Sequence, residues 1–121
     1  MSWQDEIDAL EQRLALARAM GGAEKLERQR AAGRGNARGR IAAIADEGSF
    51  HEIGALAGFA SYDDEGTLDA FQPANFIFGR ALVDGRPVVL TADDFTVRGG
   101  AADASLHRKL IAAEQLVSEY R

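Results

Sequence analysis

The feature that most constrains the fold is the order of elements in the second half of the chain. Residues 76–83 and 87–92 are rich in β-branched, aromatic and other apolar side chains, and the turn at 84–86 contains a glycine, which predicts a β-hairpin. A glycine pair at 99–100 then precedes 101–121, where apolar side chains recur at steps of four and three, as in an amphipathic helix. A strand, a glycine turn and a helix form half of a βαβ unit, so the sequence predicts an incomplete crossover.

Three helices are predicted before residue 46, over residues 3–17, 23–32 and 37–45, with Gly21-Gly22 ending the first. The second helix has a single large apolar side chain, so we expect it to pack on another element or to lie exposed. The side chains expected to be buried are Trp3, Ile7, Leu10, Leu14 and Ala17 in the first helix, Leu26 in the second, Ile41 and Ile44 in the third, and Leu106, Leu110, Ala113, Val117 and Tyr120 in the C-terminal helix.

The chain changes from helical to extended at the turn-forming residues 46–49. Residues 50–56 predict a weak strand, and 62–74, with four consecutive turn-forming or acidic residues and a proline, predict a solvated excursion without regular structure. The continuously apolar run 88–90 predicts a strand that is covered on both faces.

Composition excludes several classes of protein. A chain of 121 residues with 46% hydrophobic residues is the size of one globular domain, and the absence of cysteine rules out disulfides, thiolate nucleophiles and zinc ribbons. No apolar run reaches the length of a membrane span and the N-terminus lacks a signal-peptide pattern, so we expect a cytoplasmic protein. The net charge of -5 argues against a dedicated nucleic-acid-binding domain.

Charge is unevenly distributed, because residues 24–40 hold six basic residues against two acidic ones. Arginine side chains in this stretch suit phosphates of a ligand or carboxylates of a neighbouring subunit. The alternative is a solvated helical face with pairs four residues apart, such as Glu24 with Arg28. No aromatic residue lies among these basic residues, which disfavours nucleic-acid binding by this stretch.

Three groups of motifs, in order, carry a resemblance to a known family. They are Gly21-Gly22-Ala23-Glu24-Lys25 through Gln29-Arg30-Ala31-Ala32-Gly33; Ala37-Arg38-Gly39-Arg40-Ile41 with Gly48-Ser49-Phe50; and Gly85-Arg86-Pro87-Val88-Val89 with Asp94-Phe95-Thr96-Val97 and Gly99-Gly100. Over nearly its whole length the chain resembles the start of the carboxyltransferase subunits of biotin-dependent acyl-CoA carboxylases, the propionyl-CoA carboxylase β type. Asn36 and Gly39 depart from the family, which usually has threonine and glutamate there.

The resemblance implies an α/β fold: an incomplete crotonase-like domain of the ClpP/crotonase ββα superhelix over residues 46–121, preceded by an N-terminal helical segment over 1–45. It implies an enzyme that moves a carboxyl group from carboxybiotin to the α-carbon of an acyl-CoA. The expected partners are the acyl-CoA, a biotin carboxyl carrier or biotin carboxylase subunit that carries the biotin, and further copies of the chain, with no nucleic acid and no membrane. Family members are much longer, so we expect the isolated chain to be inactive.

The resemblance places the turn Gly99-Gly100 at the acyl-CoA pocket, with Phe95 and Thr96 as further candidates. From the basic stretch, Arg38 and Arg40 are added as candidates for binding acyl-CoA, because they flank the helix anchored by Ile41. Free N–H groups at a helix N-terminus beside glycines suit an anion or a carbonyl oxygen. The alternative is a tight turn that binds nothing. No catalytic residue is predicted, because the family's main oxyanion motif follows the strand that should come after the C-terminal helix. No metal ligand is predicted either, because the acidic and histidine residues lack the spacing of metal ligands.

Other residues that carry chemistry lack a supporting pattern. Asp93 and Asp94 are neighbours on an expected strand, so their side chains point to opposite faces and make a poor acid–base pair. His51 and His107 show no metal-ligand spacing. A second hypothesis for the whole chain is a non-catalytic assembly module, in which the apolar faces of the first and last helices bind a partner.

Overall fold

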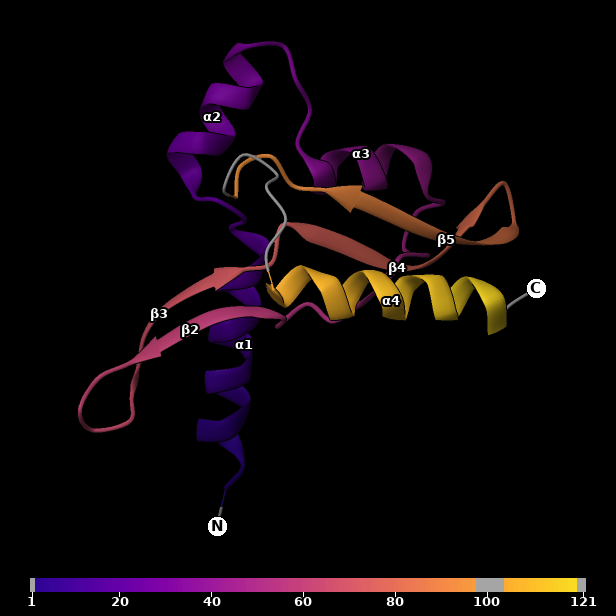
Figure 1. The fold of residues 1–121 in the computed structure, drawn as a ribbon. Helices are drawn as coiled ribbons and strands as arrows, with labels where there is room; N and C mark the ends of the chain where they lie inside the picture. Colours follow the sequence, from indigo (N-terminus) through magenta and orange to yellow (C-terminus); the bar gives the residue numbers. More distant parts are fainter. Residues whose placement is uncertain (1, 98–103, 120–121) are drawn as a thin grey trace.

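The computed structural model describes residues 2–97 and 104–119, and Figure 1 shows how their elements are arranged. The helices are α1 (Gln4–Arg18), α2 (Ala23–Ala31), α3 (Ala37–Ile44) and α4 (Ala104–Glu119), and the strands are β1 (His51–Ile53), β2 (Gly58–Tyr62), β3 (Leu68–Pro73), β4 (Phe76–Val83) and β5 (Arg86–Asp93). The structure thus contains the three N-terminal helices, the weak strand near residue 50, the hairpin and the C-terminal helix that the sequence predicts.

The centre of the molecule is an antiparallel sheet with the strand order β1-β4-β5. β4 and β5 are joined by a two-residue turn, since Val83 pairs with Arg86. Asp84 and Gly85 both have positive φ, 51° and 76°, as a turn of type I′ requires. The Asp46 carboxylate accepts hydrogen bonds from the backbone N–H groups of both turn residues, at 2.9 and 2.8 Å, and this fixes the turn against the end of α3.

A helix covers each face of this sheet, as Figure 1 shows for α3 and α4. Because side chains alternate along a strand, Ile77 of β4 points to the α3 face and packs with Met20, Ala37 and Ile41. Phe76 and Phe78 point to the opposite face and pack on Ala113 and Leu116 of α4. α3 and α4 both contact β5, but residues 88–90 are only half-buried, so the prediction of a strand covered on both faces is only partly correct.

The interpretation of residues 62–74 as an irregular excursion is wrong. β2 and β3 pair as a second, two-stranded antiparallel sheet, and the acidic residues form its turn. The Asp63 carboxylate accepts from the backbone N–H groups of Glu65 and Thr67, and Gly66 takes a φ of 83°. The pattern failed because this hairpin buries little, so its sequence shows no apolar alternation.

The predicted buried faces of two helices are also only partly correct. In α1 Ala17 is buried, whereas Ile7 and Leu10 are exposed, and Trp3, just before the helix, is 74% exposed. The helix contacts β3, crosses the β2–β3 hairpin and extends away from the three-stranded sheet (Figure 1). Ile41 anchors α3 as expected, but Ile44 is exposed.

In α4 the buried line is shifted around the helix from the predicted one. Lys109, Ala113 and Leu116 face the sheet, again at steps of four and three, while Leu110 and Val117 are exposed. The small side chain of Ala113 fits over the two phenylalanine rings of β4. The side chain of Leu106, and Tyr120, lie outside the residues that the structure describes.

Gly21 makes a close backbone contact that its position at a helix end does not reveal. A Cβ atom placed on Gly21 would lie 1.9 Å from the carbonyl oxygen of Thr96, and the Gly21 N–H donates to Thr96 Oγ1 at 2.9 Å. α1 ends at Arg18, and the left-handed φ that follows it, 56°, belongs to Met20, whereas Gly22, with a φ of 99°, is the residue before α2. The predicted role of the glycine pair is therefore only partly correct: the helix ends before the pair, and Gly21 instead lets the backbone approach the loop after β5.

We predict that Gly21→Ala destabilises the protein by about 1–3 kcal/mol, because backbone atoms must move to admit the methyl group. The matched control is Gly35→Ala, whose added Cβ would sit 3.6 Å from Arg40 Cγ, an ordinary contact, and should change stability by less than about 0.5 kcal/mol. Urea unfolding followed by circular dichroism measures both. Equal stability of the two variants would contradict the close contact.

Candidate functional site

A hollow of about 230 Å³ lies between the segment that joins α2 to α3 and the loop after β5. The two walls come from distant parts of the sequence and meet because α3 packs on β5. The hollow is lined by Gln29, Arg34, Gly35, Asn36, Ala37 and Arg40 on one side and by Asp93, Asp94, Phe95 and Thr96 on the other.

The loop wall of the hollow is held by buried hydrogen bonds. Asp94 Oδ1 accepts from the backbone N–H of Thr96 at 2.9 Å and from its hydroxyl at 2.6 Å, and the Asp94 N–H donates to the Asn75 carbonyl at 2.8 Å. Asp94 and Thr96 are almost fully buried, whereas Phe95 between them is 62% exposed. The loop therefore presents one aromatic side chain to solvent from a fixed backbone, and Asp94 has a structural role.

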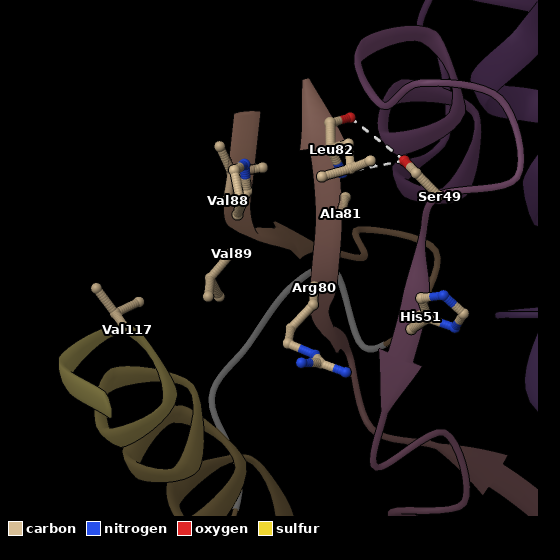
Figure 2. A pocket seen from close by; sticks show the side chains of 9 residues that line it. Ser49, His51, Arg80, Ala81, Leu82, Val88, Val89 and Val117 are labelled. Carbon is tan, nitrogen blue, oxygen red and sulfur yellow. Dashed lines mark hydrogen bonds between the residues drawn. The ribbon is translucent and has the colours of Figure 1, made fainter. Parts of the chain in front are cut away.

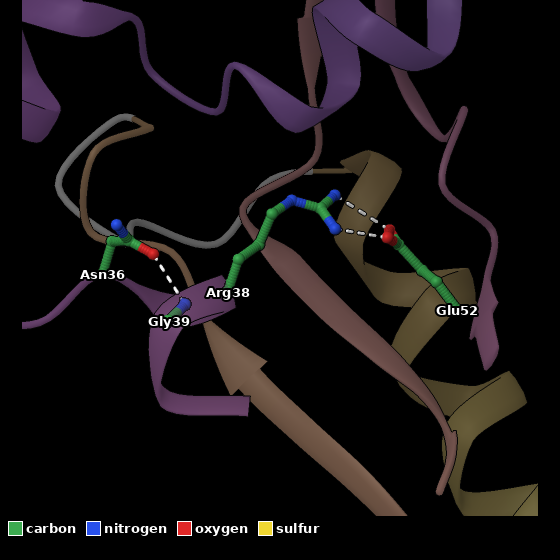
Figure 3. Close-up of polar contacts among 4 residues, drawn as sticks. All are labelled: Asn36, Arg38, Gly39 and Glu52. Atoms are coloured by element: carbon green, nitrogen blue, oxygen red, sulfur yellow. Dashed lines mark hydrogen bonds and ion pairs between the residues drawn. The ribbon is translucent and has the colours of Figure 1, made fainter. Parts of the chain in front are cut away.

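The helical wall begins at α3, whose N-terminus is capped by Asn36. Figure 3 shows the Asn36 side chain accepting from the Gly39 N–H, at 2.7 Å. A helix leaves its first N–H groups without internal partners, so this bond satisfies one of them. The cap sets the direction in which α3 leaves the preceding segment and thereby the position of Arg40, one helical turn further on.

Arg38 points away from the hollow and pairs with Glu52 of β1 (Figure 3). The pair is bidentate, with Arg38 Nη2 donating to Glu52 Oε2 at 3.0 Å and Nη1 donating to Oε1. The two side chains are 24% and 15% exposed, so most of both is removed from water. Arg38 was predicted to bind acyl-CoA, but it joins α3 to β1 instead of lining the hollow. Its partner Glu52 was not among the candidate residues from the sequence.

Lys109 of α4 is buried in the same interior region, with 7% of its surface exposed. Its aliphatic stem passes over Gly54, where an added Cβ would lie 3.3 Å from Lys109 Cε. Burial lowers the pKa of Lys109, the Glu52 carboxylate opposes that shift, and the Arg38 guanidinium adds to it. Charged groups from α3, β1 and α4 thus meet inside the molecule.

A second and larger hollow, of about 640 Å³, lies on the face of the sheet that α4 partly covers, beside the part that the helix reaches (Figure 2). α4 covers the half of the sheet that carries Phe76 and Phe78 and leaves the half that carries Arg80 and Leu82 open. His51 and Val89 lie beside Arg80 on the neighbouring strands, so all three share this face. The hollow is mostly apolar, and no pattern in the sequence predicted it.

The structure brings together part of the predicted site. Arg40, Phe95 and Thr96 line one hollow, Arg38 does not, and Gly99 and Gly100 lie outside the described residues. Arg34 and Gln29 join the hollow although the sequence did not single them out for it.

Among residues 2–97 and 104–119, no group of three or more metal-binding side chains could hold an ion. No helix within those ranges has the length and apolarity to cross a membrane.

Residues 28–120 match the family described as "Carboxyl transferase domain". This chain belongs to that family. The matched range contains both walls of the hollow, the central sheet and α4. The resemblance seen in the sequence is therefore confirmed.

Relatives of the family are similar to this chain over most of its length. The methylmalonyl-CoA decarboxylase subunit alpha of Veillonella parvula is 30% identical over 93% of this chain and 22% of its own length. The propionyl-CoA carboxylase beta chain of Cereibacter sphaeroides is 34% identical over 88% of this chain and 21% of its own. The chain thus spans about a fifth of the length of these relatives.

Solved structures show the same fold. A transcarboxylase 12S structure with methylmalonyl-CoA and methylmalonic acid bound, described as a hexamer assembly, superposes with a TM-score of 0.81 at 26% identity, over 96% of this chain and 23% of that one. The expected fold class, part of a crotonase-like α/β domain preceded by N-terminal helices, is confirmed.

We predict that Arg38→Ala destabilises the protein by roughly 2–3 kcal/mol, because the Glu52 carboxylate is left without its arginine in a mostly buried position. The matched control is Arg28→Ala, because Arg28 pairs with Glu24 at 2.8 Å with both side chains largely exposed, and such pairs contribute less than about 1 kcal/mol. Denaturant unfolding measures both variants. A smaller loss for Arg38→Ala than for Arg28→Ala would contradict this account.

A pH dependence follows from Lys109. The pKa of Lys109 is lowered in the folded state, so between that value and the unfolded value of about 10.4 the unfolded chain binds more protons, and stability rises with pH. We expect the wild type to gain stability relative to Lys109→Met as the pH rises from about 8 to about 10.5. Thermal unfolding across that range measures the difference, with Lys25→Met controlling for loss of an amine elsewhere. If the stability of the wild type relative to Lys109→Met instead fell as the pH rose, burial would not be the main influence on the pKa of Lys109.

Proposed function

We propose that this chain is part of a carboxyltransferase that moves a carboxyl group from carboxybiotin to the α-carbon of an acyl-CoA. The observation that supports this most directly is the family match over residues 28–120, which includes both walls of the Arg40 hollow. The carboxylated biotin supplies the carboxyl group and is carried by a partner protein or domain. We assign no residue of this chain to the biotin.

In this proposal the acyl-CoA lies against the hollow, and the predicted residues contribute in different ways. Arg40 and Phe95 contact the substrate, because both line the hollow and both are exposed. Thr96 positions Phe95, because its hydroxyl is already engaged with Asp94 and with the Gly21 N–H. Arg38 acts through α3, because it is paired with Glu52.

Gly99 and Gly100 remain predicted contacts for the acyl-CoA. Removal of the α-proton of a thioester places negative charge on its carbonyl oxygen, and N–H donors held in place stabilise such an oxyanion. Glycine residues before a helix allow a close approach to that oxygen.

The assembly around the chain belongs to the same proposal. The transcarboxylase 12S relative is described as a hexamer, and we infer that this chain also works in an oligomer, in the cytoplasm. The chain covers about a fifth of its relatives, so we propose that it does not catalyse the transfer by itself.

A second candidate function, a non-catalytic assembly module, is favoured by the exposed surface. Trp3, the residue before α1, and Ile7 and Leu10 of α1 are exposed at helical spacing on one apolar face. The total accessible surface is 8407 Å², whereas a compact monomer of 13.0 kDa exposes about 6,300 Å². That excess of about 2,100 Å² is more than the roughly 800 Å² that one partner buries in a standard protein–protein interface.

A segment replacement distinguishes the two functions. The matching fifth of the Cereibacter sphaeroides propionyl-CoA carboxylase beta chain is replaced by this chain, and carboxylation of propionyl-CoA is measured with the biotin carrier present. We expect the replaced enzyme to retain activity, a version with that fifth deleted to have none, and the isolated chain to have none.

Carboxylation by the isolated chain would contradict the proposal that it is silent by itself. A replaced enzyme that assembles but is as inactive as the deletion would favour the assembly module. Size-exclusion chromatography with light scattering establishes whether each version assembles.

A further inference from the structure

A small polar hollow lies in the interior of the molecule, where residues of α3, β1, α4 and the loop after β5 come together. It measures about 10 Å³, and among the described residues that line it none is exposed. Four of these residues are charged, namely Arg38, Glu52, Asp94 and Lys109, and the rest of the lining is apolar. In this interior hollow, charged groups from four parts of the chain therefore border one small space.

The hydrogen-bonding capacity of Arg38 is only partly used. Its two terminal nitrogens, Nη1 and Nη2, both donate to the Glu52 carboxylate. Its third donor, Nε, is buried and has no hydrogen-bond partner among the described residues. A donor that is removed from water and left without an acceptor is costly, so buried N–H groups nearly always have a partner. The Arg38 Nε–H therefore requires an acceptor that these residues do not supply.

Lys109 and Asp94 have unused capacity at the same hollow. The Lys109 amine forms no hydrogen bond or ion pair with any residue in the described ranges, although the residue is only 7% exposed. Asp94 is 2% exposed, and both of its side-chain bonds, to Thr96, are accepted by Oδ1. Its other oxygen, Oδ2, accepts none from the described residues. Two donors and one acceptor thus border the interior hollow with bonds still to make.

Size and charge together select the ligand. A polar cavity takes up one water molecule from about 10–15 Å³ upward, so this hollow has room for one and no more. With Lys109 protonated, the two cationic and two anionic side chains balance, and with Lys109 neutral their sum is negative, so neither state attracts an anion. A metal ion is disfavoured because the guanidinium of Arg38 has only donors. Water, which is neutral and both donates and accepts, fits these groups.

We propose that one water molecule is bound in this interior hollow, where it accepts hydrogen bonds from Arg38 Nε and Lys109 Nζ and donates one to Asp94 Oδ2. Buried waters typically make about three such bonds. This water connects α3 and α4 to the loop after β5. Asp94 lines both the interior hollow and the hollow beside Phe95, so the water supports from behind the loop that presents Phe95 to solvent.

A crystal structure of the 121-residue chain at about 1.5 Å resolution tests the site directly. We expect one water within about 2.7–3.2 Å of Arg38 Nε, Lys109 Nζ and Asp94 Oδ2. Crystals grown with bromide in place of chloride distinguish water from a halide, because only bromide gives an anomalous signal there. A dry hollow, a bromide signal, or a direct bond from Lys109 to Asp94 with no water between them would each overturn the proposal.

Hydrogen exchange measured by NMR tests the connection to the loop. We expect Lys109→Met to raise the exchange rate of the Thr96 backbone N–H about tenfold, because the water that holds Asp94 loses a donor. The N–H groups that pair β4 with β5 should change much less. The matched control is Lys25→Met, at an exposed lysine of α2, which should leave the Thr96 rate unchanged.

Equal acceleration of the Thr96 N–H and of the β4–β5 pairing would show a general loss of stability, and it would overturn the connection between the water and the loop. An unchanged Thr96 rate in Lys109→Met would overturn it as well. Circular dichroism establishes that both variants fold, and the crystal structure of the wild type tests the water without any substitution.

Discussion

The contact between Gly21 and Thr96 is the constraint on which the candidate site depends. It joins residues 75 positions apart in the sequence, through a hydrogen bond from the glycine N–H and a backbone approach that no side chain would permit. Thr96 in turn is fixed by Asp94, so the end of α1 and the loop after β5 are tied together. The direction in which the chain enters α2, and hence the helical wall of the hollow, follows from that connection.

The interior charges form a second connection, on the far side of α3. Arg38 and Glu52 join α3 to β1, and Lys109 brings α4 to the same region. Burying three charges costs desolvation energy that a purely apolar contact would avoid. In return the geometry of a bidentate pair is specific, and it fixes the position of α3 along β1 in a way that small apolar side chains such as Ala37 cannot.

The sequence predicted local structure well where the determinants are local. The hairpin followed from Asp84-Gly85 between β-rich runs, and the turn there has the expected positive φ values. The faces of α1 and α4 were predicted less well, because periodicity identifies an apolar stripe but not what covers it. Lys109 is an example of what periodicity does not predict. A lysine in a helix is expected to be exposed to water, and its burial follows from the approach of Glu52 and Gly54.

The candidate site was predictable only in part, because some of its residues lie in recognisable motifs and others reach it only through the packing of distant elements. Phe95 and Arg40 lie in the motifs that carry the family resemblance, whereas Arg34 lies in a glycine-rich turn and reaches the site only through the packing of α3 on β5. Arg38 and Arg40 look equivalent in the sequence, but they are two residues apart on a helix and so point in different directions. Only the position of Glu52 shows which of them is paired.

The two departures from the family at the start of α3 act on this same site. Asn36 keeps the capping function that threonine supplies, since its side chain accepts from the Gly39 N–H. Gly39 occupies the position from which a glutamate would complete a capping box, so its carboxylate is lost between the two arginines. Loss of an acid there leaves α3 without one half of its cap. It also removes one negative charge from beside Arg40, which favours the binding of an anion by that arginine.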